Sequence, residues 1–232
     1  MRRAALVIAW FFLAAGAGAA EARQPVVVEL FTSQGCSSCV AADSLLGDIA
    51  TRPGVLALTL AVDYWDYLGW SDTFARPEFT LRQRAYMQKL AIREVYTPQI
   101  VVDGASQAAG ADRKKIEALI RQAQHAKTPA PPVWFGRHGK VAVGAARAPV
   151  GGADVWLVRY DPAKQEVSVK RGENRGQTLV QRNVVRQLVR LGAWYGKARF
   201  YAVPPASGGD TLKTCILLQA VKGGRIIAVA QK

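Results

Sequence analysis

Two cysteines separated by two residues follow directly on an apolar run, and this feature limits the possible folds most. The run spans residues 26–31, and Gly35-Cys36-Ser37-Ser38-Cys39 comes next. A strand that ends in a Cys-x-x-Cys turn and opens a helix is typical of a redox site. The start of a helix presents free N–H groups and the positive end of its dipole, and both stabilise a thiolate. We therefore predict that Cys36 is the nucleophile and that Cys39, one turn further on, resolves a mixed disulfide on it.

Two other interpretations of the cysteine pair are an inert disulfide and half of a metal site in a copper or zinc chaperone. A zinc site needs further ligands, and Cys215, His125 and His138 are the candidates. None of them forms a second ligand pair, so we expect no metal and no cofactor. Cys215 lies inside an apolar run and is predicted to be a buried core residue.

The first residues have the pattern of a secretory signal. Met1-Arg2-Arg3 is basic, residues 4–15 are apolar and residues 16–20 are small. The apolar stretch is short for a membrane span, although a retained anchor is the alternative. We predict a signal peptide over residues 1–22 and a periplasmic or secreted protein. In an oxidising compartment a Cys-x-x-Cys pair cycles only with a redox partner, either a disulfide-containing protein or a thiol.

Charge is distributed unevenly along the chain. The net charge is +14, yet residues 23–126 hold 11 basic and 11 acidic residues, whereas residues 127–232 hold 18 basic and 5 acidic residues. Such a step suggests two units with different surfaces. The basic unit favours phosphates or acidic proteins, and in an exported protein an anionic envelope surface is a better partner than nucleic acid. A merely solvated basic face is the alternative.

The first half predicts an α/β unit. Apolar spacing and Pro/Gly stops indicate helices over residues 40–50, 77–90 and 112–126. Residues 55–62 form a continuous apolar run suited to a strand buried on both faces. With the strand at 26–31 and the helix at 40–50, this run makes a parallel βαβ unit.

An aromatic segment, residues 63–70, follows the second strand and leads into an inserted helical segment. Tyr64 and Trp65 are candidates for lining a substrate groove, with Asp63 and Asp66 as supporting residues. The alternative is that the aromatic side chains only pack the insertion against the fold.

Thr97 and Pro98 stand immediately ahead of a strand at 100–102, which turns into a hairpin with residues 105–108. A proline at this place can adopt a cis peptide bond at modest cost, and in folds of the thioredoxin type this loop faces the Cys-x-x-Cys turn. We therefore take Thr97 and Pro98 as substrate-binding residues. An ordinary trans proline is the alternative.

The second half predicts strands. Residues 127–132 form a proline-rich linker, and short alternating runs punctuated by glycines follow it. We expect strands near 140–146, 154–160, 166–170, 178–191, 197–203, 215–221 and 225–230. Strands at this spacing predict an all-β, immunoglobulin-like sandwich over residues 133–232, after an α/β domain over residues 23–126.

Several long motifs resemble one family, the secreted bacterial thioredoxin-like proteins classed as domain of unknown function 1223. The motifs are Leu30-Phe31-Thr32-Ser33-Gln34-Gly35-Cys36-Ser37-Ser38-Cys39, Val62-Asp63-Tyr64-Trp65-Asp66-Tyr67-Leu68-Gly69-Trp70, Val95-Tyr96-Thr97-Pro98-Gln99, Arg171-Gly172-Glu173-Asn174 and Asn183-Val184-Val185-Arg186. The resemblance implies a thioredoxin-like fold and a disulfide activity, and it names no substrate.

From these observations we expect an exported thiol–disulfide oxidoreductase in which Cys36 and Cys39 are catalytic. Gly35, Ser37 and Ser38 support the cysteines within the turn. The rival expectation is a non-catalytic envelope binding module, with a structural disulfide and a basic docking surface.

Overall fold

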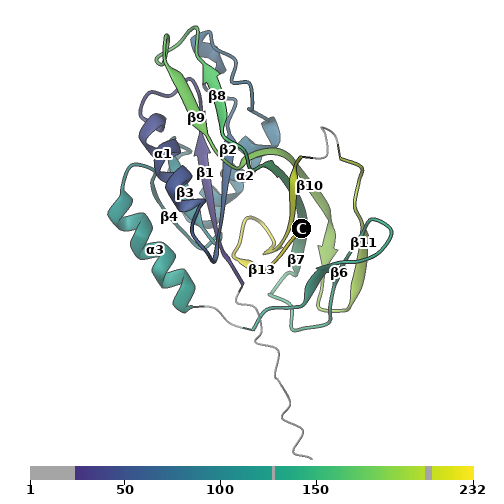
Figure 1. The fold of residues 1–232 in the computed structure, drawn as a ribbon. Coiled ribbons are helices and arrows are strands. Elements are labelled where there is room, and N and C mark those ends of the chain that lie inside the picture. Colours follow the sequence, from purple (N-terminus) through teal and green to yellow (C-terminus); the bar gives the residue numbers. More distant parts are fainter. Residues whose placement is uncertain (1–23, 127–128, 207–210) are drawn as a thin grey trace, which may run out of the picture.

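The computed structural model describes residues 24–126, 129–206 and 211–232 (Figure 1). The predicted signal peptide lies outside the described residues, as do residues 127 and 128 of the predicted linker and residues 207–210.

A parallel βαβ unit forms the centre of the first half, as predicted. β1 (Val26–Thr32) and β2 (Val55–Ala61) pair in parallel, and α1 (Cys39–Ile49) connects them. Every residue of β1 is buried because alternate side chains enter two different cores. Val28 and Leu30 pack in the core beneath α1, whereas Val27 and Phe31 pack in the core on the other face.

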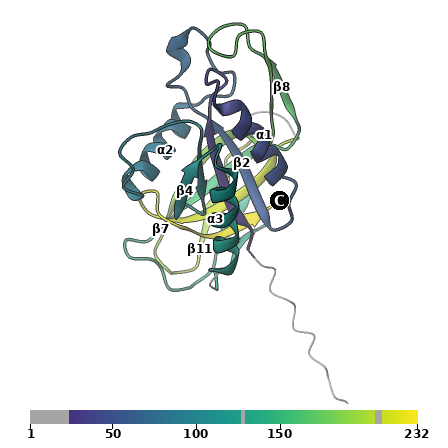
Figure 2. The same cartoon turned by 90° about the vertical axis from the view of Figure 1, so that its left-hand side faces the viewer.

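Helices cover both faces of this part of the sheet. α1 and α3 (Arg113–His125) lie on one face, where Leu46, Ile116 and Ile120 join the core (Figure 2). α2 (Pro77–Lys89) covers the opposite face with Phe79 and Tyr86. The remaining elements of the first half are the short helix η1 (Asp66–Leu68) and the antiparallel strands β3 (Gln99–Val102) and β4 (Ser106–Ala109).

The second half extends the same sheet. It adds β7 (Ala153–Asp161), β10 (Val184–Trp194), β12 (Lys213–Ala220) and β13 (Ile226–Gln231), giving the order β13-β12-β7-β10-β2-β1-β3-β4. β10 joins β2 in parallel with Val184 opposite Thr59, and the Asn183 side chain donates to the Ala57 carbonyl at 2.8 Å. Within the described residues we therefore find no separate immunoglobulin-like domain. That prediction is corrected because strand patterns report local conformation and do not identify the pairing partner.

Two small antiparallel sheets complete the fold. The first, in the order β11-β6-β5, contains β5 (Val133–Phe135), β6 (Lys140–Val143) and β11 (Arg199–Ala202). Its inner face packs Val141, Val143 and Tyr201 against the second-half part of the large sheet. The second is the hairpin of β8 (Gln165–Ser168) and β9 (Thr178–Gln181), whose strand β9 lies against α1 (Figure 1).

The two halves share one core as well as one sheet. Side chains from residues 27 to 229 form one cluster that includes Phe31, Tyr86 and Cys215. Cys215 is fully buried, as predicted, and burial raises the pKa of its thiol.

A buried ion pair lies at the same junction. The Arg82 guanidinium binds Glu29 with Nε 2.6 Å from Oε1, and its Nη1 donates to Gln219 at 2.9 Å. Because Glu29 belongs to β1 and Gln219 to β12, the guanidinium ties one half of the chain to the other.

Candidate redox site

Cys36 and Cys39 form a disulfide at the carboxyl end of β1, with their Cα atoms 5.4 Å apart. The turn is held by the Cys36 N–H, which donates to the Ser33 carbonyl at 3.1 Å, and by the Cys39 N–H, which donates to the Cys36 carbonyl at 3.1 Å. α1 begins at Cys39 itself, with Ser38 as its N-cap residue. Cys36 therefore lies just ahead of the positive end of the helix dipole, where a thiolate is stabilised.

The loop before β3 lies directly against this turn. The Thr97–Pro98 peptide bond is cis. The Thr97 hydroxyl donates to Cys36 Sγ at 3.4 Å and itself accepts a hydrogen bond from Trp65 Nε1 at 2.8 Å. The structure thus brings Thr97, Pro98 and Trp65, all named from the sequence, to the first cysteine.

Two hydroxyl groups approach the Cys36 sulfur. Besides Thr97, the Ser38 hydroxyl lies 3.4 Å from Cys36 Sγ. In the reduced protein, hydrogen bonds donated to a sulfur stabilise its charged form and lower its pKa. Ser37 and Ser38 are exposed, whereas Cys36 is 1% exposed and Cys39 is fully buried. The disulfide is therefore covered, and a partner reaches it only when part of the cover moves.

Other residues named from the sequence support the surrounding loops and make no contact with sulfur. The Asp63 carboxylate accepts a hydrogen bond from Thr80 at 2.6 Å, and Asp66 accepts from the Asp72 N–H at 3.1 Å. The Gly35 N–H donates to the Ser33 hydroxyl at 3.0 Å.

Tyr64 connects the aromatic segment to α2. Its hydroxyl donates to Gln83 at 3.2 Å, and burial raises its pKa to about 12. Both Tyr64 and Trp65 pack against the core.

Sequence reasoning missed two site residues in the loop between β8 and β9. Asn174 is fully buried, and its Nδ2 donates to the carbonyls of Gln34 at 2.9 Å and of Cys36 at 3.0 Å. Glu173 Oε2 accepts from the backbone N–H of Ser37 at 3.0 Å and from its hydroxyl at 2.7 Å, and these bonds lower the pKa of Glu173. The only sequence signal was the Arg171-Gly172-Glu173-Asn174 motif, which carried the family resemblance but no role.

Asp43 was also missed. It lies one turn after Cys39 in α1 and is 5% exposed. Gln181 Nε2 donates to Asp43 Oδ1 at 3.4 Å, and burial outweighs this bond and raises the pKa of Asp43 to about 7. Asp43 Oδ2, Gln181 Oε1 and Thr32 Oγ1 are buried without a hydrogen-bond partner. In the sequence, the signal that could have indicated Asp43 is an acidic residue among the apolar positions of the helix.

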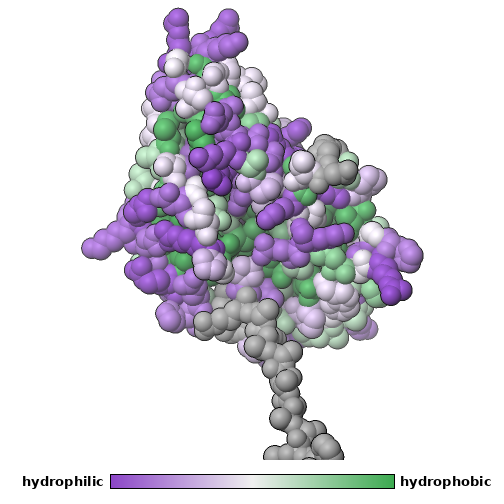
Figure 3. Space-filling view, in the orientation of Figure 1, coloured by the Kyte–Doolittle hydropathy of each residue, from purple (hydrophilic) through white to green (hydrophobic). Residues whose placement is uncertain are grey.

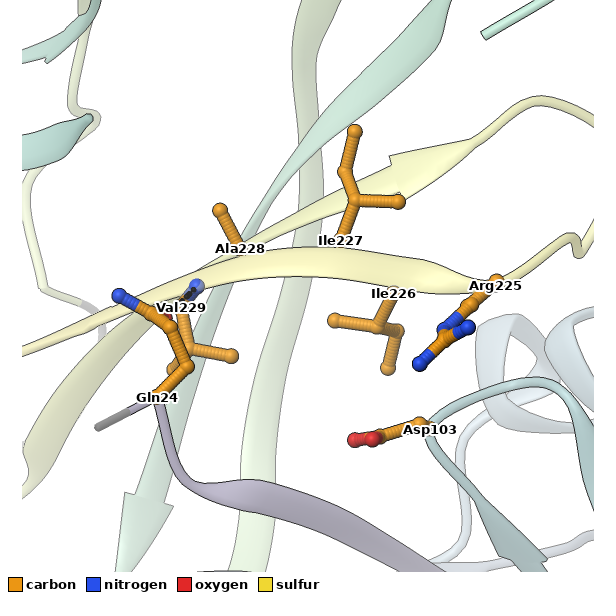
Figure 4. A pocket seen from close by; sticks show the side chains of 7 residues that line it. All are labelled: Gln24, Asp103, Arg225, Ile226, Ile227, Ala228 and Val229. Atoms are coloured by element: carbon orange, nitrogen blue, oxygen red, sulfur yellow. Dashed lines mark hydrogen bonds between the residues drawn. The ribbon is translucent and has the colours of Figure 1, made fainter. Parts of the chain in front are cut away.

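A cavity of about 250 Å³ lies elsewhere and is separate from this site (Figure 4). It is lined by Gln24, Asp103 and Arg225 together with residues 226–229. Asp103 accepts a hydrogen bond from the Val27 N–H at 2.7 Å, which places the cavity at the opposite end of β1 from the cysteines.

No cluster of three or more His, Cys, Asp or Glu side chains in residues 24–126, 129–206 and 211–232 is arranged to hold a metal ion. No helix in the same ranges is long and apolar enough to cross a membrane.

The fold and the cysteine pair define a mixed α/β protein with one large mixed sheet, two small antiparallel sheets and a close Cys-x-x-Cys disulfide. Residues 27–219 match the family described as protein of unknown function (DUF1223), and the chain belongs to this family. The family resemblance inferred from the motifs is thereby confirmed.

Two solved structures are similar. A crystal structure of a protein from Agrobacterium tumefaciens is 31% identical, with a TM-score of 0.69, covering 89% of this chain and 92% of that one. HBP35 of Porphyromonas gingivalis is 12% identical, with a TM-score of 0.58, covering 90% of this chain and 75% of that one, and shows likeness of fold alone. A comparison with curated proteins gives no match.

Proposed function

We propose that this protein is a thiol–disulfide oxidoreductase whose first half, residues 23–126, is a thioredoxin-like unit with an inserted helical segment. The observation that carries the proposal is the contact between Cys36 Sγ and the Thr97 hydroxyl at 3.4 Å, next to the cis Thr97–Pro98 bond. Together with the helix that begins at Cys39, this contact supports a stabilised thiolate on Cys36.

The reaction is a two-electron exchange. In the reduced protein the Cys36 thiolate attacks a disulfide of the partner, forming a mixed disulfide and releasing one partner sulfur as a thiolate, which takes up a proton. Cys39 then attacks the Cys36 sulfur, which re-forms the Cys36–Cys39 disulfide and releases the second partner sulfur. The partner disulfide is reduced and the cysteine pair is oxidised. The reverse sequence oxidises a partner dithiol.

Asp43 is proposed as the general base that accepts the proton of Cys39 during the second step. Residues four apart on a helix are neighbours, with about 5–6 Å between their Cβ atoms. Asp43 is buried and carries an oxygen without a hydrogen-bond partner. Its raised pKa, about 7, suits a group that gains and loses a proton near neutral pH.

The expected partner is a disulfide-containing protein or a small thiol, and the chemistry needs no cofactor. An oxidising compartment, periplasmic or extracellular, suits a protein that carries this disulfide.

Trapping tests the assignment of the two cysteines. A Cys39→Ser variant retains the nucleophile and lacks the resolving thiol, so it should accumulate covalent adducts with a disulfide-containing protein such as insulin. Cys36→Ser should yield few adducts. The adducts should disappear on reduction, and Cys215→Ser should leave them unchanged because Cys215 is buried. Equal adduct yields from Cys39→Ser and Cys36→Ser would contradict the assignment.

A structural disulfide in a non-catalytic module is the second candidate, and the low exposure of Cys36, 1%, favours it. The two candidates differ in reduction potential. Structural disulfides lie below about −300 mV, whereas catalytic pairs lie between about −270 and −120 mV.

A further inference from the structure

The outer face of the sheet β11-β6-β5 carries two exposed aromatic side chains in one row. Trp134 in β5 and Phe200 in β11 both pair with Ala142 in β6. Directly paired residues place their side chains on the same face of a sheet. Trp134 is 46% exposed and Phe200 is 65% exposed, whereas Ala142 is 1% exposed, as expected for a small side chain between two rings.

The row faces away from the core. Its neighbours along the strands, Val141, Val143 and Tyr201, point the other way and pack against the large sheet. The fold itself therefore gives the two rings no packing role comparable to that of Tyr201. Exposed apolar side chains grouped in this way mark interaction surfaces more often than isolated ones do.

The segments that form this small sheet contain no acidic residue. Residues 129–150 and 195–206 hold basic residues and neither Asp nor Glu. The basic side chains are exposed, and they are Arg137, Lys140, Arg147, Lys197 and Arg199. The local charge is uniformly positive, so the surface complements an anionic one.

The strand register places one cation, Lys140, on the face of the aromatic row. Lys140 lies two residues before Ala142 in β6, so its side chain is on the same face as the rings, next to the β5–β6 turn that contains Arg137. Arg199 pairs with Val143 and is on the other face, with its guanidinium 5.6 Å from the centre of the Tyr201 ring. Figure 3 shows hydrophobic and strongly hydrophilic residues side by side over β6 and β11, at the right of the molecule. An apolar row beside exposed cations suits a planar partner that accepts both rings and charges.

We propose that this face, the outer side of β11-β6-β5 with Trp134, Phe200 and Lys140, docks on an anionic phospholipid bilayer together with the exposed cations of the adjoining turns. Trp and Phe rings enter the headgroup layer, where aromatic side chains are enriched. Lys and Arg side chains bind the lipid phosphates. A soluble polyanion would use the same cations but has no apolar layer to receive two exposed rings.

Docking in this way keeps the cysteine turn away from the bilayer. The carboxyl end of β1 and the β8–β9 hairpin lie at the other end of the molecule from the small sheet (Figures 1 and 2). The proposal does not depend on the redox function, because the two surfaces share no residue.

Vesicle binding of the full chain tests the proposal. Vesicles of phosphatidylcholine with about 30% phosphatidylglycerol should bind the protein about tenfold more tightly than phosphatidylcholine alone. The affinity should fall as salt rises from about 50 to about 500 mM. The double variant Trp134→Ser/Phe200→Ser should bind anionic vesicles about tenfold more weakly. Leu81→Ser, which removes an exposed apolar side chain from α2, is the matched control and should bind like the wild type.

The charges are tested separately. Lys140→Gln/Lys197→Gln should weaken binding to anionic vesicles by about tenfold and reduce its salt dependence. Lys114→Gln/Lys115→Gln, which removes two exposed cations from α3, should have no effect. Residues 1–23 are the same in every variant, so their contribution to binding cancels in these comparisons.

Two results would overturn the proposal. One is equal vesicle binding by the wild type and by Trp134→Ser/Phe200→Ser. The conservative double variant Trp134→Tyr/Phe200→Tyr is made in parallel and should retain binding. The other is tight binding of polyglutamate or a single-stranded oligonucleotide that depends on Lys140 and Lys197, with vesicle binding independent of the rings. The second result would identify a general polyanion surface.

Discussion

Asn174 donates a hydrogen bond to the carbonyl oxygen of Cys36 at 3.0 Å across 138 positions of sequence. The same amide nitrogen donates to the Gln34 carbonyl. One side chain from the second half therefore binds both ends of the turn from Gln34 to Cys36. The candidate redox site is therefore built by both halves of the chain, and the second half is more than an appended surface.

Asn174→Ala should destabilise the protein. It removes the amide donor of the Gln34 carbonyl and leaves the Cys36 carbonyl with the Cys39 N–H alone, which costs about 1–3 kcal/mol. Urea unfolding of the oxidised protein measures this loss. Gln177→Ala removes an exposed amide from the same loop and should change the free energy of unfolding by less than about 0.5 kcal/mol. Equal effects of the two variants would show that Asn174 does not hold the turn.

Glu173→Gln should lower the pKa of the Cys36 thiol in the reduced protein. The Glu173 carboxylate binds the Ser37 N–H next to the nucleophile, and a neighbouring negative charge disfavours a thiolate. The pH dependence of Cys36 alkylation measures this pKa in a Cys39→Ser background. Glu166→Gln removes an exposed acid from the same hairpin and should leave the pKa unchanged. A pKa that rises in Glu173→Gln would contradict the interpretation.

Asp43 should make the protein less stable as the pH rises from about 4 to about 7. Its pKa in the folded protein, about 7, is above the unfolded value of 3.8, so the folded state holds the proton more tightly in this interval. The free energy of unfolding therefore falls with rising pH, by up to about 4 kcal/mol. Asp43→Asn should abolish most of this dependence and be the more stable protein at pH about 8.

Urea unfolding of Asp43→Asn and wild type across this interval measures the difference. Asp48→Asn, an exposed acid on the same helix, is the control and should retain the wild-type slope. Identical slopes for Asp43→Asn and wild type would show that Asp43 is not buried as an acid.

Arg82→Met should destabilise both halves of the chain together. It leaves the Glu29 carboxylate buried without its cation, which costs about 3–5 kcal/mol. Because β1 and β12 belong to one sheet and share one core, the two strands of the oxidised variant should still unfold in one transition when hydrogen exchange is followed in both. Arg84→Met, an exposed cation of α2, should have little effect. Separate transitions in β1 and β12 would indicate two independent domains.

The sequence predicted the elements that depend on local pattern. The strand at 26–31, the helix after the cysteines and the strand at 55–62 were each placed within a residue or so because apolar spacing and Pro/Gly stops are local signals. The cis Thr97–Pro98 bond followed from a proline ahead of a strand combined with the upstream cysteine motif.

The sequence did not indicate which distant segments pair in the sheet. Val184 and Thr59 are 125 positions apart, and nothing in either strand specifies the other as a neighbour. The same limit hid Asn174 and Gln181, because a polar residue of a hairpin is expected to be solvated until the fold brings Asn174 to the cysteine turn and Gln181 to α1. Among the missed residues, Asp43 was the one that a local pattern indicated, because it is an acidic residue on the buried face of a helix.

The most direct test of the account is the reduction potential of the Cys36/Cys39 pair, measured at equilibrium with glutathione. A catalytic couple should lie between about −270 and −120 mV, with thiols that react in the order Cys36 before Cys39. A potential below about −300 mV, with both thiols unreactive after reduction, would contradict the account and identify the pair as a structural disulfide.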